Sequence, residues 1–172
     1  MLTASDVCFG CLGQGRSGKT TLLKQVAGGF RRGGVGVLAL TLPHDTWEAA
    51  SWQTSDPERF VEMFNRATRC ACFMEFSDAS VDKFSKPFEE MFTKGRHRGH
   101  RMFAIAQRHT QISPLIRDQW DAFWLFSCGI KTAAILSEEF GDDAIREAAT
   151  YPRYKYLFKR RCMPILHGGP RG

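Results

Sequence analysis

Gly13-Gln14-Gly15-Arg16-Ser17-Gly18-Lys19-Thr20 fits the P-loop pattern G-x-x-x-x-G-K-[ST] at every fixed position. The glycines allow the backbone to curl until successive N–H groups converge on phosphate oxygens. In such a loop Lys19 reaches the β- and γ-phosphates, and the Thr20 hydroxyl ligates Mg²⁺. The stretch therefore predicts a site for ATP with Mg²⁺. The expected phosphate-binding residues are Gly13, Gln14, Gly15, Arg16, Ser17, Gly18, Lys19, Thr20 and Thr21.

The segments on either side of the loop have the structure that a P-loop requires. Residues 7–12 form a short apolar run typical of a buried strand. Residues 21–30 predict a helix that starts at the loop and stops at the Gly28-Gly29 pair. Such a helix would direct the positive end of its dipole at the phosphates.

Two alternatives to a triphosphate site are a dinucleotide site and a plain glycine-rich turn. Residues 13–18 also match G-x-G-x-x-G, which expects an acid about 20 positions on to hold a ribose. The predicted second strand, 35–42, is followed by Pro43, and the first acid is Asp45. Lys19 and Thr20 would also have no special role in a dinucleotide fold, so the triphosphate is favoured.

Length and composition are those of one globular domain. The chain has 172 residues, of which 43% are hydrophobic and 24% charged. We expect a P-loop domain over 1–160 and a C-terminal tail over 161–172. We expect neither a secretory signal nor a transmembrane segment, because no apolar run approaches ~18 residues. The six cysteines are interpreted as buried free thiols of an intracellular protein.

Predicted strands and helices alternate along the rest of the chain. Residues 45–56 are expected to form a loop. Further strands are predicted over 70–76, 102–107, 122–127 and 154–158, and helices over 58–67, 81–94 with an interruption at Pro87, 114–119, 131–140 and 142–150. The alternation predicts an α/β protein with the three-layer P-loop NTPase fold, in which helices cover both faces of a mostly parallel sheet.

Candidate catalytic residues stand at the ends of two of these strands. Hydrolysis needs a carboxylate at the end of a second buried strand, where it supports Mg²⁺ through water or orients the attacking water. Glu75 is our first choice for the catalytic or metal-linked carboxylate. A carboxylate inside so apolar a strand costs free energy, so its presence indicates a function. Asp78 is second, and the alternative for it is a helix N-cap. Gln107 can contact both the γ-phosphate and the water, or it is a surface residue.

These residues together resemble the FtsK–HerA superfamily of DNA-pumping ATPases. The resemblance rests on the P-loop, the strand that carries the acid, Gly95-Arg96 before the fourth strand and Gln107-Arg108 at its end. Residues 94–108 and 113–119 are most similar to genome-packaging ATPases of tailless icosahedral viruses and phages. The resemblance covers about residues 5–160.

The resemblance implies a role for each candidate. Glu75 would be the Walker B acid, Gln107 the polar sensor, and Arg96 an arginine finger that reaches a neighbouring subunit's site. Met74 stands where such proteins usually have an Asp, so the division of roles between Glu75 and Asp78 stays open.

The implied activity is ATP hydrolysis coupled to the movement of viral double-stranded DNA into a preformed capsid. The implied partners are DNA bound independently of sequence, capsid or packaging-vertex proteins, and further copies of the chain in a ring, expected to be a hexamer. The location would be the host cytoplasm or the packaging vertex. The alternatives are a small P-loop kinase, with 96–101 as its lid, and a nucleotide-dependent phage morphogenesis protein.

Two basic clusters suit contact with a phosphate backbone. One is the connector 95–101, for which a solvated loop is the alternative, and the other lies near the C-terminus. The second cluster consists of Lys155, Lys159, Arg160 and Arg161.

Overall fold

A computed structural model of the chain describes residues 6–76 and 86–169. Its strands are β1 (Cys8–Leu12), β2 (Val37–Leu40), β3 (Trp52–Thr54), β4 (Ala71–Phe76), β5 (Arg101–Ala106), β6 (Ala122–Phe126), β7 (Tyr156–Arg160) and β8 (Leu166–Gly168). Its α-helices are α1 (Lys19–Arg32), α2 (Pro57–Arg66), α3 (Lys86–Lys94), α4 (Pro114–Asp118) and α5 (Ile130–Phe140), and its 3-10 helices are η1 (Gly95–Arg98), η2 (His109–Gln111) and η3 (Asp143–Thr150).

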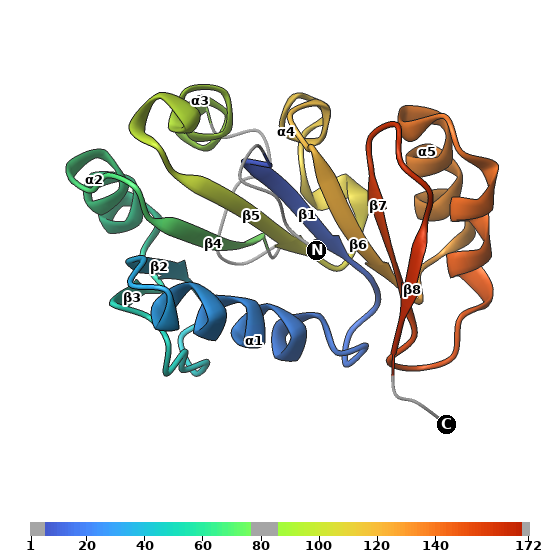
Figure 1. Cartoon of the computed structure of the whole chain (residues 1–172), viewed down its shortest axis with the longest axis horizontal. Coiled ribbons are helices and arrows are strands. Elements are labelled where there is room, and N and C mark those ends of the chain that lie inside the picture. The colour runs from blue at the N-terminus through green and yellow to red at the C-terminus, as the bar shows by residue number, and fades with distance from the viewer. Residues whose placement is uncertain (1–5, 77–85, 170–172) are drawn as a thin grey trace.

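The strands form one sheet in the order β3-β2-β4-β5-β1-β6-β7-β8 (Figure 1). The pairs from β3 to β6 are parallel, and β7 and β8 continue the sheet in antiparallel pairs. Because β5 lies between β1 and β4, the carboxyl ends of these three strands meet at one edge of the sheet. This edge carries the P-loop.

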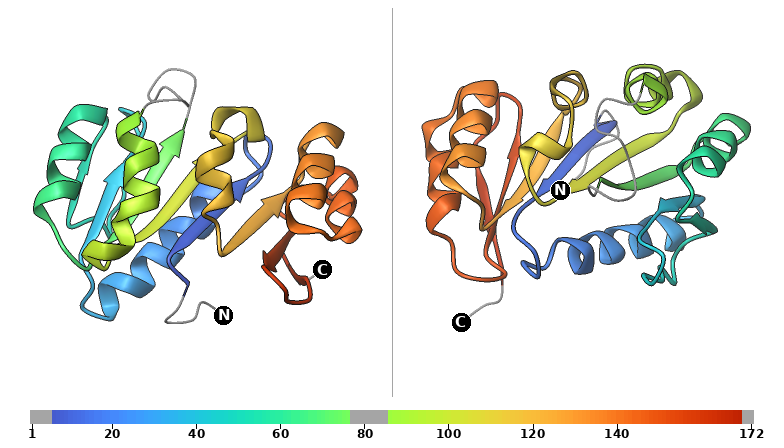
Figure 2. Two further views of the ribbon diagram at one scale, coloured as in Figure 1. Left: turned by 90° about the horizontal axis from the view of Figure 1, so that it is seen from above. Right: turned by 180° about the vertical axis from the view of Figure 1, so that it is seen from behind.

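Helices cover both faces of the sheet (Figures 1 and 2). On one face α1 packs through Leu23 and Ala27 against the strands. On the other, α2, α3, α4 and α5 lie side by side over a second apolar cluster. The predicted α/β fold, a mostly parallel sheet between two helical layers, is therefore confirmed.

Aromatic rings hold the middle of the sheet together beneath α1. The ring of Phe103 on β5 stacks on Phe9 of β1 and on Phe73 of β4, with centroid separations of 4.6 and 4.4 Å. On the opposite face, Gly10 makes room for Trp120: a Cβ at Gly10 would lie 2.5 Å from the indole ring. Successive residues of β1 point to opposite faces, so the ring of Phe9 packs on one face and Gly10 leaves space for Trp120 on the other.

The structure differs from the sequence prediction at several places: β2 and β7 are Val37–Leu40 and Tyr156–Arg160, and the predicted helix 142–150 is the 3-10 helix η3. Helix α1 continues through Gly28 and Gly29 to Arg32. Packing of Ala27 and Phe30 against the sheet outweighs the low helix propensity of glycine, which is about 1 kcal/mol per residue. The predicted loop 45–56 contains the short edge strand β3, which pairs with β2. Residues expected in the tail form β8, which pairs with β7.

Other boundaries follow their sequence signals closely. Ser113 caps α4, with its Oγ accepting from the backbone N–H of Ile116, and Pro114 occupies the first turn as expected. Helix α3 begins one residue before Pro87, and the predicted residues 81–85 lie outside the described part of the chain. Within residues 6–76 and 86–169, every helix is too short or too polar to cross a membrane.

The close approach of Trp120 to Gly10 generates a stability prediction. Gly10→Ala should lower the free energy of unfolding by about 1–3 kcal/mol, because the added methyl group overpacks the core. Gly29→Ala is the matched control, since a Cβ there meets no atom within 4 Å and lies in a helix. It should raise stability by about 0.4–1 kcal/mol. Urea unfolding measures both variants, and an unchanged Gly10→Ala would contradict the packing described.

Candidate active site

The P-loop joins β1 to α1 at the carboxyl edge of the sheet. Gly13 and Gly18 have φ values of +148° and +104°, which L side chains rarely adopt. A Cβ at Gly13 would also lie 2.6 Å from Cβ of Phe126 on β6. The glycines of the motif are therefore required by conformation at both positions and by space at Gly13.

Lys19 is held inside this loop. Its ammonium group donates hydrogen bonds of 2.8 Å to the carbonyl oxygens of Gly13 and Gln14, and the residue is only 7% exposed. Burial lowers the pKa of Lys19. The N-cap residue of α1 is Gly18, which has no side chain to cap the helix, so the first N–H groups and the positive dipole end suit an anion. The loop thus gathers a lysine and backbone amides around one point.

Glu75 lies close enough to Lys19 for the two charges to interact. Burial raises the pKa of its carboxyl group, and the nearby charge of Asp45 raises it further, while Lys19 and Lys24 act in the opposite direction. The carboxylate therefore lies within the field of the P-loop lysine, as expected of an acid at this strand end. Asp78, the other candidate, lies outside the described residues.

Asp45 is a site residue that sequence reasoning did not select. Its carboxylate forms an ion pair with Lys24 of α1 and accepts a 3.0 Å hydrogen bond from the indole N–H of Trp47. Asp45 follows β2, which is the neighbour of β4. The signal was present in the sequence, because the ends of adjacent parallel strands converge and Asp45 is the first acid after the second strand.

Gln107 follows β5 and lies over the P-loop. Its side-chain oxygen is 3.9 Å from the position of a Cβ built on Gly15. The turn is fixed because the N–H groups of Gln107 and Arg108 both donate to the side-chain oxygen of Gln111, at 2.8 and 2.9 Å. A cavity of about 650 Å³ opens beside it, with Gln14 and Lys131 in its lining.

Arg96 lies at the other end of the sheet. Helix η1 precedes β5, and the Arg96 guanidinium lowers the pKa of the Cys8 thiol, which burial raises to about 12. Cys8 begins β1, whereas the P-loop begins after its last residue. Five residues of parallel strand span roughly 16 Å, so Arg96 cannot reach the P-loop of its own chain. Its side chain is exposed.

The two basic clusters predicted from the sequence, the C-terminal cluster and the connector 95–101, have side chains that are used within the fold. The C-terminal cluster is used largely within the fold: Lys159 pairs with Asp142, Arg160 pairs with Asp6, and Arg161 binds the carbonyl of Trp120. Three members of this cluster thus have partners within the fold, which leaves less free charge for a phosphate backbone than the sequence indicated. In the connector, His100 is buried, accepting from the N–H of Cys70 and donating to the carbonyl of Phe64.

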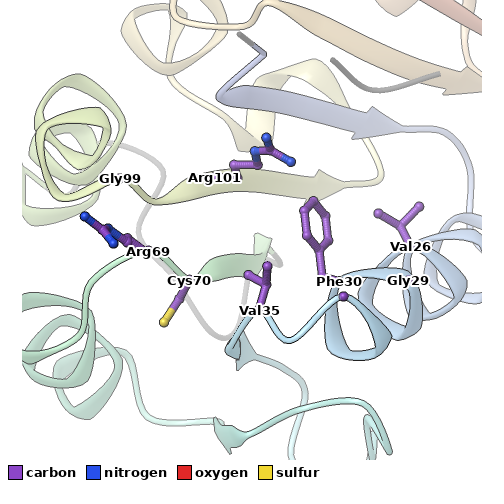
Figure 3. A pocket seen from close by; sticks show the side chains of 9 residues that line it. Val26, Gly29, Phe30, Val35, Arg69, Cys70, Gly99 and Arg101 are labelled. Carbon is purple, nitrogen blue, oxygen red and sulfur yellow. The ribbon is translucent and has the colours of Figure 1, made fainter. Parts of the chain in front are cut away.

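A second cavity, of about 520 Å³, opens at the amino end of the sheet (Figure 3). Phe30 and Val35 supply apolar walls, and Arg69 and Arg101 supply charge. The Arg101 guanidinium lies 5.5 Å from the centre of the Phe30 ring, a cation–π contact. This cavity is therefore apolar within and cationic at two of its walls, at the end of the sheet opposite the P-loop.

The residues at the carboxyl edge suit Mg²⁺ and a triphosphate. Mg²⁺ prefers oxygen ligands, and the Thr20 hydroxyl and Glu75 carboxylate offer them next to the lysine. The Ser17 hydroxyl is buried and has no hydrogen-bond partner in the described part of the chain, which leaves a donor within the loop itself. The donor set and the glycine cradle therefore fit the predicted cofactors.

Comparison with known proteins identifies the fold. No protein-family model matches the sequence, and no curated protein matches it. Among solved structures, the genome packaging NTPase B204 of Sulfolobus turreted icosahedral virus 2, in complex with AMPPCP, is 14% identical with a TM-score of 0.77, over 99% of this chain and 100% of that one. The conjugation coupling protein TcpA of pCW3, with ATPγS, is 12% identical with a TM-score of 0.69, over 95% of this chain and 59% of that one.

A third similar structure is the N-terminal domain of zonular occludens toxin from Neisseria meningitidis. It is 11% identical with a TM-score of 0.59, over 97% of this chain and 95% of that one. The chain therefore has the P-loop NTPase fold. The expected resemblance to packaging ATPases is confirmed as a likeness of fold.

The buried position of Glu75 generates a pH prediction. A raised pKa means that ionising Glu75 costs free energy in the folded protein. The wild-type chain should therefore lose stability, relative to Glu75→Gln, as pH rises from the ordinary value of 4.5 through the raised pKa. Urea unfolding of both chains at pH 4.5 and pH 8 measures the difference.

Glu62→Gln removes an exposed carboxylate of α2 and serves as the control for loss of one charge. Glu75→Gln should be the more stable chain at pH 8, with the advantage lost at the lower pH. A wild-type chain that is the more stable of the two at pH 8 would contradict the electrostatic description of this strand end.

Proposed function

We propose that this chain is an ATP-hydrolysing translocase that packages viral double-stranded DNA into a preformed capsid, working at the packaging vertex as a homo-oligomeric ring, expected to be a hexamer. The observation that carries this proposal is the position of Arg96, about the length of β1 away from Lys19. The likeness to B204, a genome packaging NTPase solved with AMPPCP, supports it.

The residues at the carboxyl edge have complementary roles in hydrolysis. Lys19 and the loop amides bind the β- and γ-phosphates, and Thr20, with Glu75 through water, would hold Mg²⁺. When bound, Mg²⁺ neutralises the charge that develops on the phosphate oxygens. Glu75 and Gln107 orient the attacking water from the adjacent strands β4 and β5, on the same side of the P-loop strand β1. Asp78 remains the alternative carboxylate.

Arg96 completes the site in a neighbouring copy. A positive charge beside the γ-phosphate stabilises the transition state, and Arg96 can supply it only to another chain's P-loop. The contact would join the amino end of one sheet to the carboxyl end of the next, which is a head-to-tail interface that closes into a ring. The same separation disfavours a kinase in which residues 96–101 form a lid over their own site.

An arginine surface beside the second cavity suits the phosphate backbone of DNA. Arg69 and Arg101 line this cavity at the amino ends of β4 and β5 (Figure 3). The other members lie in the last turns of α1 and α2 and in η1. The backbone N–H of Arg69 bonds the carbonyl of Arg98, which links the two loops. The arginine surface consists of Arg31, Arg32, Arg66, Arg69, Arg98 and Arg101.

Several arginines outside this surface are neutralised by carboxylates of the same chain. Such ion pairs are formed by Arg59, Arg117, Arg146 and Arg160. In residues 6–76 and 86–169, no member of the arginine surface forms such an ion pair. Arg98 and Arg31 donate hydrogen bonds to the carbonyl of Asn65 and the hydroxyl of Ser51, which leave their charge in place. Guanidinium groups that no carboxylate of the described residues neutralises favour contact with a polyanion without reading its sequence.

A shared site predicts complementation between two inactive chains. Lys19→Ala and Arg96→Ala should each lower ATP hydrolysis by at least about 10³-fold, and Arg96→Ala should keep nucleotide binding. Co-expressed in equal amounts, they should recover about a quarter of the wild-type rate, because an Arg96→Ala loop can meet the intact Arg96 of a Lys19→Ala chain. Steady-state phosphate release measures the rate.

Arg59→Ala, an exposed substitution on α2, is the control and should leave the rate unchanged. Two results would contradict the assignment. One is full activity of Arg96→Ala alone, and the other is a co-expressed ring that contains both chains and stays inactive.

The arginine surface predicts a salt-dependent loss of DNA affinity. Combining Arg31→Gln, Arg32→Gln and Arg69→Gln should weaken duplex binding equally for unrelated sequences. It should also reduce the slope of log affinity against log salt by about 2 to 3, because fewer counterions are released. Fluorescence anisotropy across a salt series measures both quantities. Arg146→Gln, on the surface of η3, is the matched control, and an unchanged slope in the triple variant would place DNA elsewhere.

A further inference from the structure

The segment between η3 and β7 returns to the P-loop and places an aromatic ring beside it. A Cβ built on Gly18 would lie 3.0 Å from Cδ1 of Tyr154, so the ring lies against the start of α1. Tyr154 is nevertheless 45% exposed, which makes it one of the most exposed large hydrophobic side chains in the described part of the chain. The ring therefore presents free surface next to a phosphate-binding loop.

Arg153 fastens this ring to the loop. Its guanidinium lies 4.7 Å from the centre of the Tyr154 ring, and its Nε donates a 2.9 Å hydrogen bond to the carbonyl oxygen of Arg16. Arg16 is the middle residue of the P-loop and has a φ of +61°. One side chain thus connects the C-terminal segment to the loop and stacks on its aromatic neighbour.

The backbone of Tyr154 is strained. Its φ of +71° is a conformation that bulky side chains avoid, at a cost of about 1–2 kcal/mol. Glycine or asparagine would adopt it more easily. A strained residue whose large aromatic ring packs on the P-loop and is still 45% exposed indicates a role beyond packing.

The side chains at the two ends of the P-loop indicate which way a bound nucleotide would lie. Gln107, between the P-loop and Glu75, lies over Gly15 and marks the γ-phosphate end. Tyr154 lies at Gly18, three residues further along the loop. A nucleotide whose γ-phosphate faces Gln107 therefore extends its nucleoside toward Tyr154.

We propose that Tyr154 is the stacking platform for the base of the nucleotide, held in position by Arg153, and that the ligand is a purine nucleoside triphosphate. Stacking on an aromatic ring stabilises any base, and a purine offers it the larger π surface. The inference rests on the proposed nucleotide site and identifies which part of the chain binds the base. It assigns a function to the strained residue that the hydrolytic mechanism does not use.

Two variants and two ligands test this proposal. Tyr154→Gly removes the ring while accepting the positive φ, and Tyr154→Phe keeps the ring and removes the hydroxyl. The ligands are ATP and inorganic tripolyphosphate, which has the phosphates but no base, each with Mg²⁺. Isothermal titration calorimetry measures their dissociation constants for the wild-type chain and both variants.

The wild-type chain should bind ATP more tightly than tripolyphosphate. Tyr154→Gly should raise the dissociation constant of ATP by about 5- to 100-fold and leave that of tripolyphosphate unchanged, since base stacking alone is lost. Tyr154→Phe should bind both ligands as the wild type does. A third variant, Arg153→Ala, measured in the same way, should lose more affinity for ATP than for tripolyphosphate, because the ring loses its attachment to the loop.

Two outcomes would overturn the platform while leaving the nucleotide site intact. One is a Tyr154→Gly chain that binds ATP with wild-type affinity. The other is an equal loss for ATP and tripolyphosphate, which would mean that Tyr154 supports the shape of the loop and not the base. A wild-type chain that binds neither ligand would instead contradict the nucleotide site itself.

Discussion

The insertion of β5 between β1 and β4, with all three strands parallel, is the constraint on which the rest of the structure depends. It brings the P-loop, Gln107 and Glu75 to a common edge, because parallel strands end together. The same constraint sends the residues before β5 to the opposite edge, and Arg96 is among them. Strand direction alone therefore gathers the phosphate-binding residues and separates them from the arginine. The stacked rings of Phe9, Phe73 and Phe103 hold these three strands in that register.

Several residues at the carboxyl edge of the sheet lower the stability of the folded chain. Lys19 and Glu75 have pKa values shifted toward their neutral forms, mainly because burial removes water from both charges. Gly13 and Gly18 adopt backbone conformations that few residues accept, and Tyr154 adopts one at a cost in energy. Such features gather at functional sites because a rigid core elsewhere offsets them. Here that core is the pair of apolar layers on the two faces of the sheet.

Much of this arrangement could be predicted from the sequence. Apolar runs and helical periods located the main parallel strands, and the P-loop fixed where the site begins. The sequence did not reveal that α1 continues through Gly28 and Gly29, because a tertiary contact such as that between Phe30 and Phe103 outweighs local propensity. Strand β3 was missed because an edge strand of three residues has too few positions to show alternation.

The site was less predictable than the fold. Asp45 is the first acid after the second predicted strand, but only the pairing of β2 with β4 shows that this position lies beside Glu75. The sequence did not show that Lys159 and Arg160 are neutralised within the fold, because their ion pairs with Asp142 and Asp6 join distant parts of the chain. Tyr154 has no motif at all. It lies more than a hundred residues from the loop it contacts, and only the return of the chain to β7 brings it there.

In the proposed ring, one chain holds half of an active site and its neighbour holds the other half. The most direct measurement is the rate of ATP hydrolysis per chain across a dilution series, with particle mass determined at each concentration by mass photometry. The rate per chain should fall with the fraction of chains in rings and reach background when only monomers remain. A monomer that hydrolyses ATP at the full rate per chain would contradict the shared site.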